Sequence, residues 1–204
     1  AFMGVVLCLL ALQTQSAAAA PLGNTYIVGG TVDGIGTCNI GVGGYVCPTL
    51  RAAVMAANAH PDSTIQLAHG ATYTLTVTPA GNDDASTGDL NLTANVTFGF
   101  VPGICLSNCR ATIAGKSGWL DRLVTIQSGV RVVMGNVNFR NGRSGAGGAI
   151  YNSGTLTLTN SLISDNNVTQ AGGGLFNDGT LILTACDVTR NDALSGGGLN
   201  NIGT

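Results

Sequence analysis

Apolar and polar residues alternate strictly in the second half of the chain. In the segment TLTLT, Leu156 and Leu158 alternate with threonines, and in TLILT Leu181 and Leu183 take the same places. A period of two puts the leucines on one face of a strand and the polar residues on the other, as a half-buried β-strand requires. The pattern therefore predicts short strands that turn their leucines toward a core.

These strands belong to a repeat of about 25 residues. The segment GGAIYNSGTLTLTNSLISDNN, from Gly147, is nearly copied from Gly172 as GGGLFNDGTLILTACDVTRND, and GGGLNNIGT from Gly196 begins a third copy. A fainter copy, SGVRVVMGNVNFRN, begins at Ser128. Repeats of roughly 20 to 50 residues are typical of stacked architectures, in which each unit needs its neighbours to bury its apolar face. We expect an all-β fold, a parallel β-solenoid.

The repeat also predicts which side chains are neighbours in successive copies. Asn152, Asn177 and Asn201 fall in one column, where their amides can hydrogen-bond along the stack. Three columns contain acidic residues, and none of them collects several acids: Arg140–Asp165–Arg190, Ser153–Asp178–Ile202 and Val137–Leu162–Asp187. We interpret the first of these as a surface charge ladder, because opposite charges alternate in it.

A threonine column raises one alternative. Thr155, Thr180 and Thr204 stack with the same period, and flat threonine arrays occur in ice-binding solenoids. The neighbouring column interrupts the array, because it contains Val132 and Ile182 on either side of its threonine. Strand propensity alone places β-branched residues on outward faces, so we prefer a structural interpretation of the threonines.

One segment, PTLRAAVMAANAHP (48–61), has helical periodicity. Its apolar residues recur at helical spacing: Leu50, Ala53, Val54 and Ala57. Thr49 can cap the N-terminus and Pro61 ends the helix. We expect this helix to cover the open end of the first strand layer.

The order of several segments resembles a known family. CPTLRAAVMAANAHPDSTIQL, GATYTLT, TGDLNLTANVTF, GWLDRLVTI and FRNG precede the repeats. This succession is similar to secreted bacterial proteins with a CSLREA-type N-terminal region and a pectin-lyase-like right-handed parallel β-helix. The resemblance covers nearly all of residues 31–204 and implies a β-helix over 62–204 that follows an N-terminal region, 21–61, with a capping α-helix. Ala52 stands where the name motif has glutamate, so no role of that glutamate is implied here.

Composition and the N-terminal segment restrict the classes of function and the location that the chain can have. Charged residues make up 9%, the net charge is −2 and Lys116 is the single lysine, so the chain lacks the basic surface that nucleic acids require. Residues 1–20 contain a short apolar run followed by small residues, which is typical of a secretory signal peptide. No later apolar run is long enough to span a membrane. We expect a secreted or cell-surface protein.

Export would permit disulfides. Cys38 and Cys47 form one close pair and Cys105 and Cys109 another, so we expect two small loop disulfides. Cys186 takes the place that a serine has one repeat earlier, and we expect a buried free thiol there. The four loop cysteines stay reduced in the alternative that the chain is not exported.

The remaining candidate site is the polar segment AGNDDASTGD. Asp83, Asp84 and Asp89 are candidate calcium ligands, and a solvated loop is the alternative. Asp121 and Arg122 in GWLDRL are interpreted as a turn beside a buried tryptophan. His60 and His69 have no cysteine or second histidine nearby in sequence, which argues against zinc.

These observations favour a non-enzymatic β-helix module for adhesion or carbohydrate contact, without a catalytic residue. The alternative is a polysaccharide lyase or glycoside hydrolase of the pectin-lyase-like fold, which would need carboxylates gathered from neighbouring repeats. Because Thr204 precedes the leucines of the third copy, we also expect a truncated solenoid. Its last layer should fray and its open end should favour end-to-end self-association.

Overall fold

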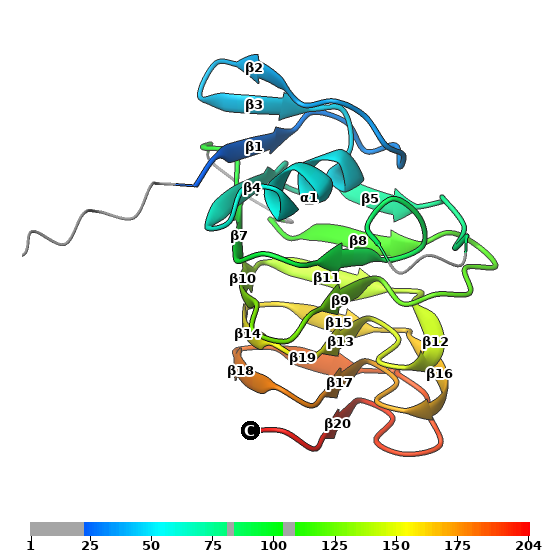
Figure 1. Ribbon diagram of the computed structural model, residues 1–204. Coiled ribbons are helices and arrows are strands. Elements are labelled where there is room, and N and C mark those ends of the chain that lie inside the picture. The colour runs from blue at the N-terminus through cyan, green and yellow to red at the C-terminus, as the bar shows by residue number, and fades with distance from the viewer. Residues whose placement is uncertain (1–22, 81–83, 104–108) are drawn as a thin grey trace, which may run out of the picture.

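The computed structural model describes residues 23–80, 84–103 and 109–204. The predicted signal peptide (1–20), Asp83 and Cys105 lie outside these residues. Most of the described chain is β-strand, and the strands pair into four sheets (Figure 1). One helix, α1 (Leu50–Asn58), is present in the described part of the chain. The predicted all-β class agrees with this composition.

The largest sheet contains, in pairing order, β18 (Thr180–Thr184), β14 (Thr155–Thr159), β10 (Arg131–Gly135), β7 (Val96–Phe100), β4 (Ser63–Leu67), β1 (Thr25–Val28), β3 (Gly44–Cys47) and β2 (Asn39–Gly41). One five-stranded sheet contains β19 (Asp187–Thr189), β15 (Leu162–Ser164), β11 (Val137–Arg140), β8 (Ala111–Gly115) and β5 (Thr72–Leu75). The other contains β20 (Leu199–Asn201), β17 (Leu175–Asn177), β13 (Ile150–Asn152), β9 (Val124–Ile126) and β6 (Leu90–Leu92). The fourth sheet pairs β12 (Arg143–Ala146) with β16 (Asn167–Ala171).

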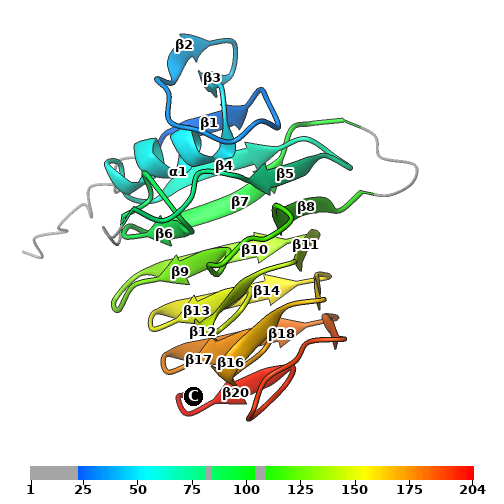
Figure 2. The same ribbon diagram turned by 90° about the vertical axis from the view of Figure 1, so that its right-hand side faces the viewer.

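The strands follow the repeat of the sequence. β13, β14 and β15 come one after another, and each pairs in parallel with the strand one repeat later, β17, β18 and β19. Figure 1 and Figure 2 show the resulting layers, which run from the N-terminal strands at the top to β20 at the bottom. Each repeat therefore adds one strand to each of these sheets, and a residue's position in the repeat decides which sheet it joins.

The predicted asparagine column is confirmed. Asn152 pairs with Asn177, and Asn177 with Asn201, in the sheet of β13, β17 and β20. The side-chain amide of Asn152 donates to Asn177 Oδ1 at 2.5 Å, and the amide of Asn177 donates to Asn201 Oδ1 at 2.6 Å. Asn152 and Asn177 are fully buried. The ladder therefore satisfies buried polar groups that would otherwise cost about 1–3 kcal/mol each.

The predicted register of β10 and β11 is wrong by one residue. Val124 pairs with Ile150, 26 residues later, whereas Val132 pairs with Leu156, only 24 residues later. The cause is the turn after β9, residues 127–130, which is two residues longer than the corresponding turn at 153–154. The longer turn lets the strands on both sides keep their apolar residues inside.

This correction changes three of the predicted columns. Arg140 lies opposite Ser164, not opposite Asp165. The residue that precedes Leu162 in the stack is Asn138, not Val137. In the threonine face, Val133 and not Val132 lies beside Thr157, while the pairing of Thr155 with Thr180 is as predicted.

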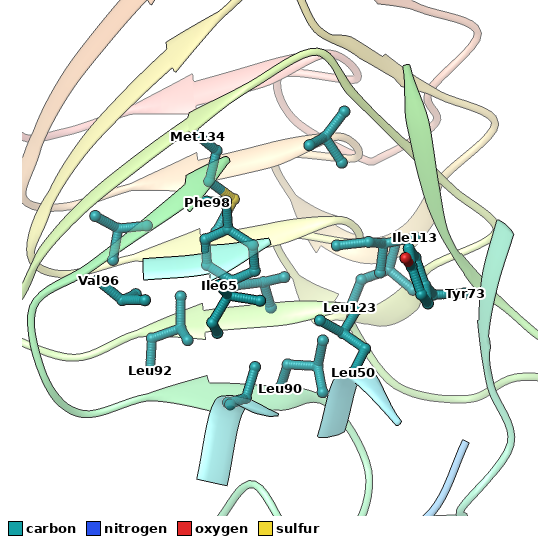
Figure 3. Packing of buried hydrophobic residues seen from close by; sticks show 14 of the residues in the cluster. Leu50, Ile65, Tyr73, Leu90, Leu92, Val96, Phe98, Ile113, Leu123 and Met134 are labelled. Carbon is teal, nitrogen blue, oxygen red and sulfur yellow. The ribbon is translucent and has the colours of Figure 1, made fainter. Parts of the chain in front are cut away.

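The helix begins as predicted, with Thr49 as its N-cap, whose side-chain oxygen accepts a hydrogen bond from the backbone N–H of Ala52 at 2.9 Å. It ends at Asn58, three residues before Pro61. Its apolar face packs against β1, β4 and β6. Figure 3 shows side chains from this helix and from three strands gathered in one cluster: Leu50, Ile65, Leu90 and Phe98.

Burial falls from the middle of the stack toward β18. Leu156 and Leu158 of β14 are fully buried, whereas Leu181 and Leu183 at the same positions of β18 are half-buried. Cys186, which follows β18, is a free thiol but is also only half-buried. The prediction of a buried thiol is therefore wrong, because the two strands next to Cys186, β18 and β19, are each paired on one side only.

Candidate functional site

Arg51, in the segment CPTLRAA, is the one charged residue of α1. Arg51 is fully buried and its guanidinium binds Asp33 through two contacts, Nε to Oδ1 at 2.8 Å and Nη2 to Oδ2 at 3.0 Å. Its remaining N–H groups donate to the backbone carbonyls of Ala85, Gly88 and Asp89. The guanidinium thus ties α1 to two loops. Sequence reasoning missed this role, because it treated Arg51 only as part of a motif.

Asp33, the carboxylate partner of Arg51, also bonds to a third segment of the chain. Its Oδ2 also accepts hydrogen bonds from the backbone N–H groups of Thr76 and Val77, at 2.7 and 2.9 Å. Burial raises the pKa of Asp33, but the hydrogen bonds from Arg51 and from the two backbone groups outweigh burial and bring this pKa below its ordinary value. Asp33 therefore stays ionised at neutral pH, and its contacts are structural.

The structure separates the candidate calcium ligands that it describes. Asp84 is exposed, and its Oδ1 accepts from the backbone N–H and the hydroxyl of Ser86. Asp89 is buried, and its two carboxylate oxygens accept from Asn91 Nδ2 and Thr125 Oγ1. Asp89 therefore does not lie in a solvated loop. Within residues 23–80, 84–103 and 109–204, no three His, Cys, Asp or Glu side chains come together as a metal ion would require.

The turn at Asp121 and Arg122 is connected to this region. Asp121 Oδ2 accepts the backbone N–H of Asp89 at 3.1 Å, and Oδ1 accepts that of Arg122 at 2.9 Å. Trp119 is buried beside the turn and its indole N–H donates to the carbonyl of Arg122 at 3.0 Å. The predicted turn beside a buried tryptophan is confirmed.

A stack of rings lies on the outward face of β13 and β17. The rings of Tyr151 and Phe176 are 5.0 Å apart and nearly parallel, at 16°, and the guanidinium carbon of Arg122 lies 5.0 Å from the centre of the Tyr151 ring. The Tyr151 hydroxyl donates to Asp178 Oδ2 at 3.3 Å. Burial, and then the negative charge of Asp178, raise the pKa of Tyr151. Sequence reasoning missed this stack, although the two aromatic residues occupy the same position of consecutive repeats.

A hollow of about 460 Å³ lies at the corner where β11 turns into β12. The loop after β8 forms one wall, with Lys116 and Trp119. Asn141 and Arg143 form the middle, and Asp165 and Asn167 of the following repeat form the other wall. The strands before these three segments, β8, β11 and β15, pair side by side, which brings the segments together from three layers.

Asp165 in this hollow is bound to Arg190 of the next repeat. Nε of Arg190 lies 2.7 Å from Oδ1 and Nη2 lies 2.9 Å from Oδ2, so this part of the predicted charge ladder is confirmed. Hydrogen bonds from Arg190 and then Ser164, with the charge of Arg140 as a smaller cause, lower the pKa of Asp165 to about 2. Asp165 therefore carries no proton near neutral pH.

The two cations of the hollow are held differently. The ammonium of Lys116 donates one hydrogen bond, to the carbonyl of Thr76 at 2.9 Å. The guanidinium of Arg143 is exposed and has no carboxylate within 4.0 Å among the described residues. The hollow can therefore offer N–H donors with positive charge, together with amide groups from asparagines.

The cysteines and histidines have structural partners. Cys38 and Cys47 form a disulfide. Cys109 is also disulfide-bonded, and its predicted partner Cys105 lies outside the described residues. His60 shares a hydrogen bond with the Tyr26 hydroxyl at 2.9 Å, and the ring of His69 stacks on Phe100. The one helix of the described residues, α1, is not long and apolar enough to cross a membrane.

Compared with known proteins, the chain matches no family model, no curated protein and no solved structure.

Proposed function

We propose that this chain is a right-handed parallel β-helix, capped at its N-terminal end by α1, which is exported and contacts carbohydrate without reacting with it. The parallel pairing of consecutive repeats in three sheets supports the β-helix. The disulfide between Cys38 and Cys47 supports export to an oxidising compartment. The likeness to CSLREA-type surface proteins remains part of the same proposal.

The polar hollow beside Arg143 carries the functional part of this proposal. Its volume, about 460 Å³, lies within the range of ligand sites, which is roughly 300–1,000 Å³. Sugars present many hydroxyl groups that both donate and accept hydrogen bonds. Asn141 and Asn167 offer amides that do the same, and Ser117 adds a hydroxyl. The lining therefore suits a sugar better than an apolar ligand.

Binding without turnover is supported by the state of Asp165. It is the only acid among the described residues that line the hollow, whereas a glycoside hydrolase needs two carboxyl groups. With a pKa of about 2, Asp165 has no proton to donate to a leaving group at neutral pH.

The alternative, a polysaccharide lyase or hydrolase, is separated from binding by one pair of measurements. The purified chain is first incubated with a glycan array, and the glycans that it retains are then tested for turnover. We expect retention without new reducing ends and without the absorbance of unsaturated sugar ends, with or without calcium. Turnover that the Asp165→Asn or Lys116→Met variant abolishes would establish the enzyme instead.

A further inference from the structure

The hollow at β12 has an unusual share of the chain's positive charge. The whole chain has 8 Lys and Arg residues and a net charge of −2. Lys116 and Arg143 line the hollow, and Arg140 is close enough for its charge to lower the pKa of Asp165. The side chains of Lys116 and Arg143 come from different layers of the stack, so the fold and not a sequence run brings these charges together.

The acids nearby do not neutralise these cations. Asp165 is bound through both oxygens to Arg190. Asp192 accepts a hydrogen bond from the Asn167 amide at 3.0 Å. Among the described residues, no carboxylate makes an ion pair with Lys116 or Arg143. The hollow therefore keeps an excess of positive charge.

The donors of the two cations are suited to an oxyanion. An ammonium has three N–H donors, and one of those on Lys116 is used by the carbonyl of Thr76. Among the described residues, no group hydrogen-bonds to the Arg143 guanidinium or forms an ion pair with it. A guanidinium binds carboxylate, sulfate or phosphate oxygens in pairs. Both side chains line the same hollow, so the unused donors of the two cations are available to a single anionic group.

Two parts of the lining of the hollow, at Trp119 and at Gly142, are closely packed. Trp119 is buried and packs so closely over Gly115 that a Cβ there would lie 2.5 Å from the indole ring. Gly142 packs against the backbone of the next segment, where a Cβ would lie 1.8 Å from the carbonyl oxygen of Gly148. One wall, at Trp119, and the middle of the hollow, at Gly142, are thus held in place before a ligand arrives, which reduces the entropy cost of binding.

We infer that this hollow binds the anionic group of an acidic glycan, a carboxylate or a sulfate, between Lys116 and Arg143. The inference rests on the proposed function and names the class of sugar that the site would take. Arg143 holds the oxyanion through paired N–H groups, Lys116 supplies a second charge, and the asparagines contact the sugar hydroxyls.

The test uses three polymers with one backbone: dextran, carboxymethyl dextran and dextran sulfate. Retention of the chain on each immobilised polymer is compared for wild type, Arg143→Gln, Lys116→Met and the control Arg131→Gln. The control removes one exposed arginine from the largest sheet. There Nη2 of Arg131 lies 3.7 Å from Oδ1 of Asp62. We expect wild type to bind an acidic polymer and not dextran, with binding that weakens as salt is added. Loss of one charge-assisted contact should weaken binding by about tenfold in each site variant.

The two acidic polymers distinguish a carboxylate from a sulfate ligand. The inference is overturned if Arg131→Gln weakens binding as much as Arg143→Gln, because the attraction is then general. It is also overturned if neutral dextran, or only neutral glycans of the array, retain the chain, and in that case the proposed carbohydrate contact stands. If no polymer and no glycan of the array is retained, both proposals fail. Circular dichroism of each variant establishes that the fold is intact.

Discussion

The region around α1 and the repeats from residue 147 onward satisfy their buried polar groups in different ways. Around α1, one arginine binds one aspartate and three carbonyls, and no other layer of the described residues repeats these contacts. In the repeats, Asn152, Asn177 and Asn201 make the same amide contact from layer to layer. A unique polar contact has no equivalent in a neighbouring layer, whereas a ladder shares its contacts among neighbours. Variants should therefore have larger effects in the first region.

The largest effect is expected for Arg51→Met. This change removes the positive partner and leaves the carboxylate of Asp33 buried without it, which costs about 3–5 kcal/mol in other proteins. Urea unfolding followed by circular dichroism should show the loss. Arg110→Gln is the matched control, because Arg110 is only half-buried and its guanidinium, among the described residues, bonds to Asn160 and to no carboxylate. Equal losses in the two variants would contradict the special role of the buried pair.

The contact between Arg51 and Asp33 also predicts how the free energy of unfolding changes in acid. The folded-state pKa of Asp33 is lowered from 3.8, so the stability that this group contributes is complete above that pH. It is lost as the pH falls below about 4 and through the lower folded-state value. Asp33→Asn should remove this part of the pH dependence. A variant whose stability falls as steeply as that of the wild type below pH 4 would contradict the assignment.

The next effect compares two leucines at one position of the repeat. Leu156→Ala empties a fully buried site and should cost about 2–5 kcal/mol. Leu181→Ala, one layer later, changes a half-buried side chain and should cost clearly less, because part of its surface already contacts water. Hydrogen exchange should agree, with slower exchange in β14 than in β18. Equal costs would mean that β18 is covered in solution, as end-to-end self-association would cover it.

The comparison also explains what the sequence could predict. Periodicity is local information, and it was sufficient for the alternating strands, for the start of the helix at Thr49 and for the asparagine column. The predicted register of β10 was wrong because the turn at 127–130 has two extra residues. Their number can be recognised only when the pairing of the strands before and after the turn is known. The partners Arg51 and Asp33 lie on different elements, and no spacing rule connects them.

For the candidate site too, the repeat predicts some contacts and not others. Tyr151 and Phe176 could have been found, since the repeat places them in one column, but their outward stack needs the sheet to be known. The hollow could not have been found, because Lys116, Arg143 and Asp165 come from three layers and share no motif. Functional surfaces of stacked repeats are therefore the least visible part of such sequences.

A smaller effect is expected for Asn177→Ala in the asparagine ladder. The amide of Asn152 loses its acceptor on Asn177, and Asn201 loses the amide that bonds its oxygen, so the cost should be about 1–3 kcal/mol. Asn200→Ala is the control, since Asn200 pairs with Phe176 and does not belong to the asparagine ladder. Thermal unfolding measures both. A neutral Asn177→Ala variant would mean that water replaces the amide, and that the ladder does not determine the register.

The smallest effect is expected for Arg190→Gln, although the contact is geometrically good. The pair of Arg190 and Asp165 lies at the surface, with 41% of the Asp165 side chain exposed, so solvent should screen the pair and leave the variant nearly as stable as the wild type. The pKa of Asp165 is about 2 in the folded chain because Arg190 is its main hydrogen-bond donor, and the variant should return it toward 3.8. The small stabilisation is complete above pH 4 and is lost as the pH falls toward 2, so variant and wild type should converge in acid. Carboxyl-carbon NMR titration of Asp165 measures the shift directly. An unchanged pKa in Arg190→Gln would show that Ser164 and Arg140, and not the ladder between repeats, control this carboxylate.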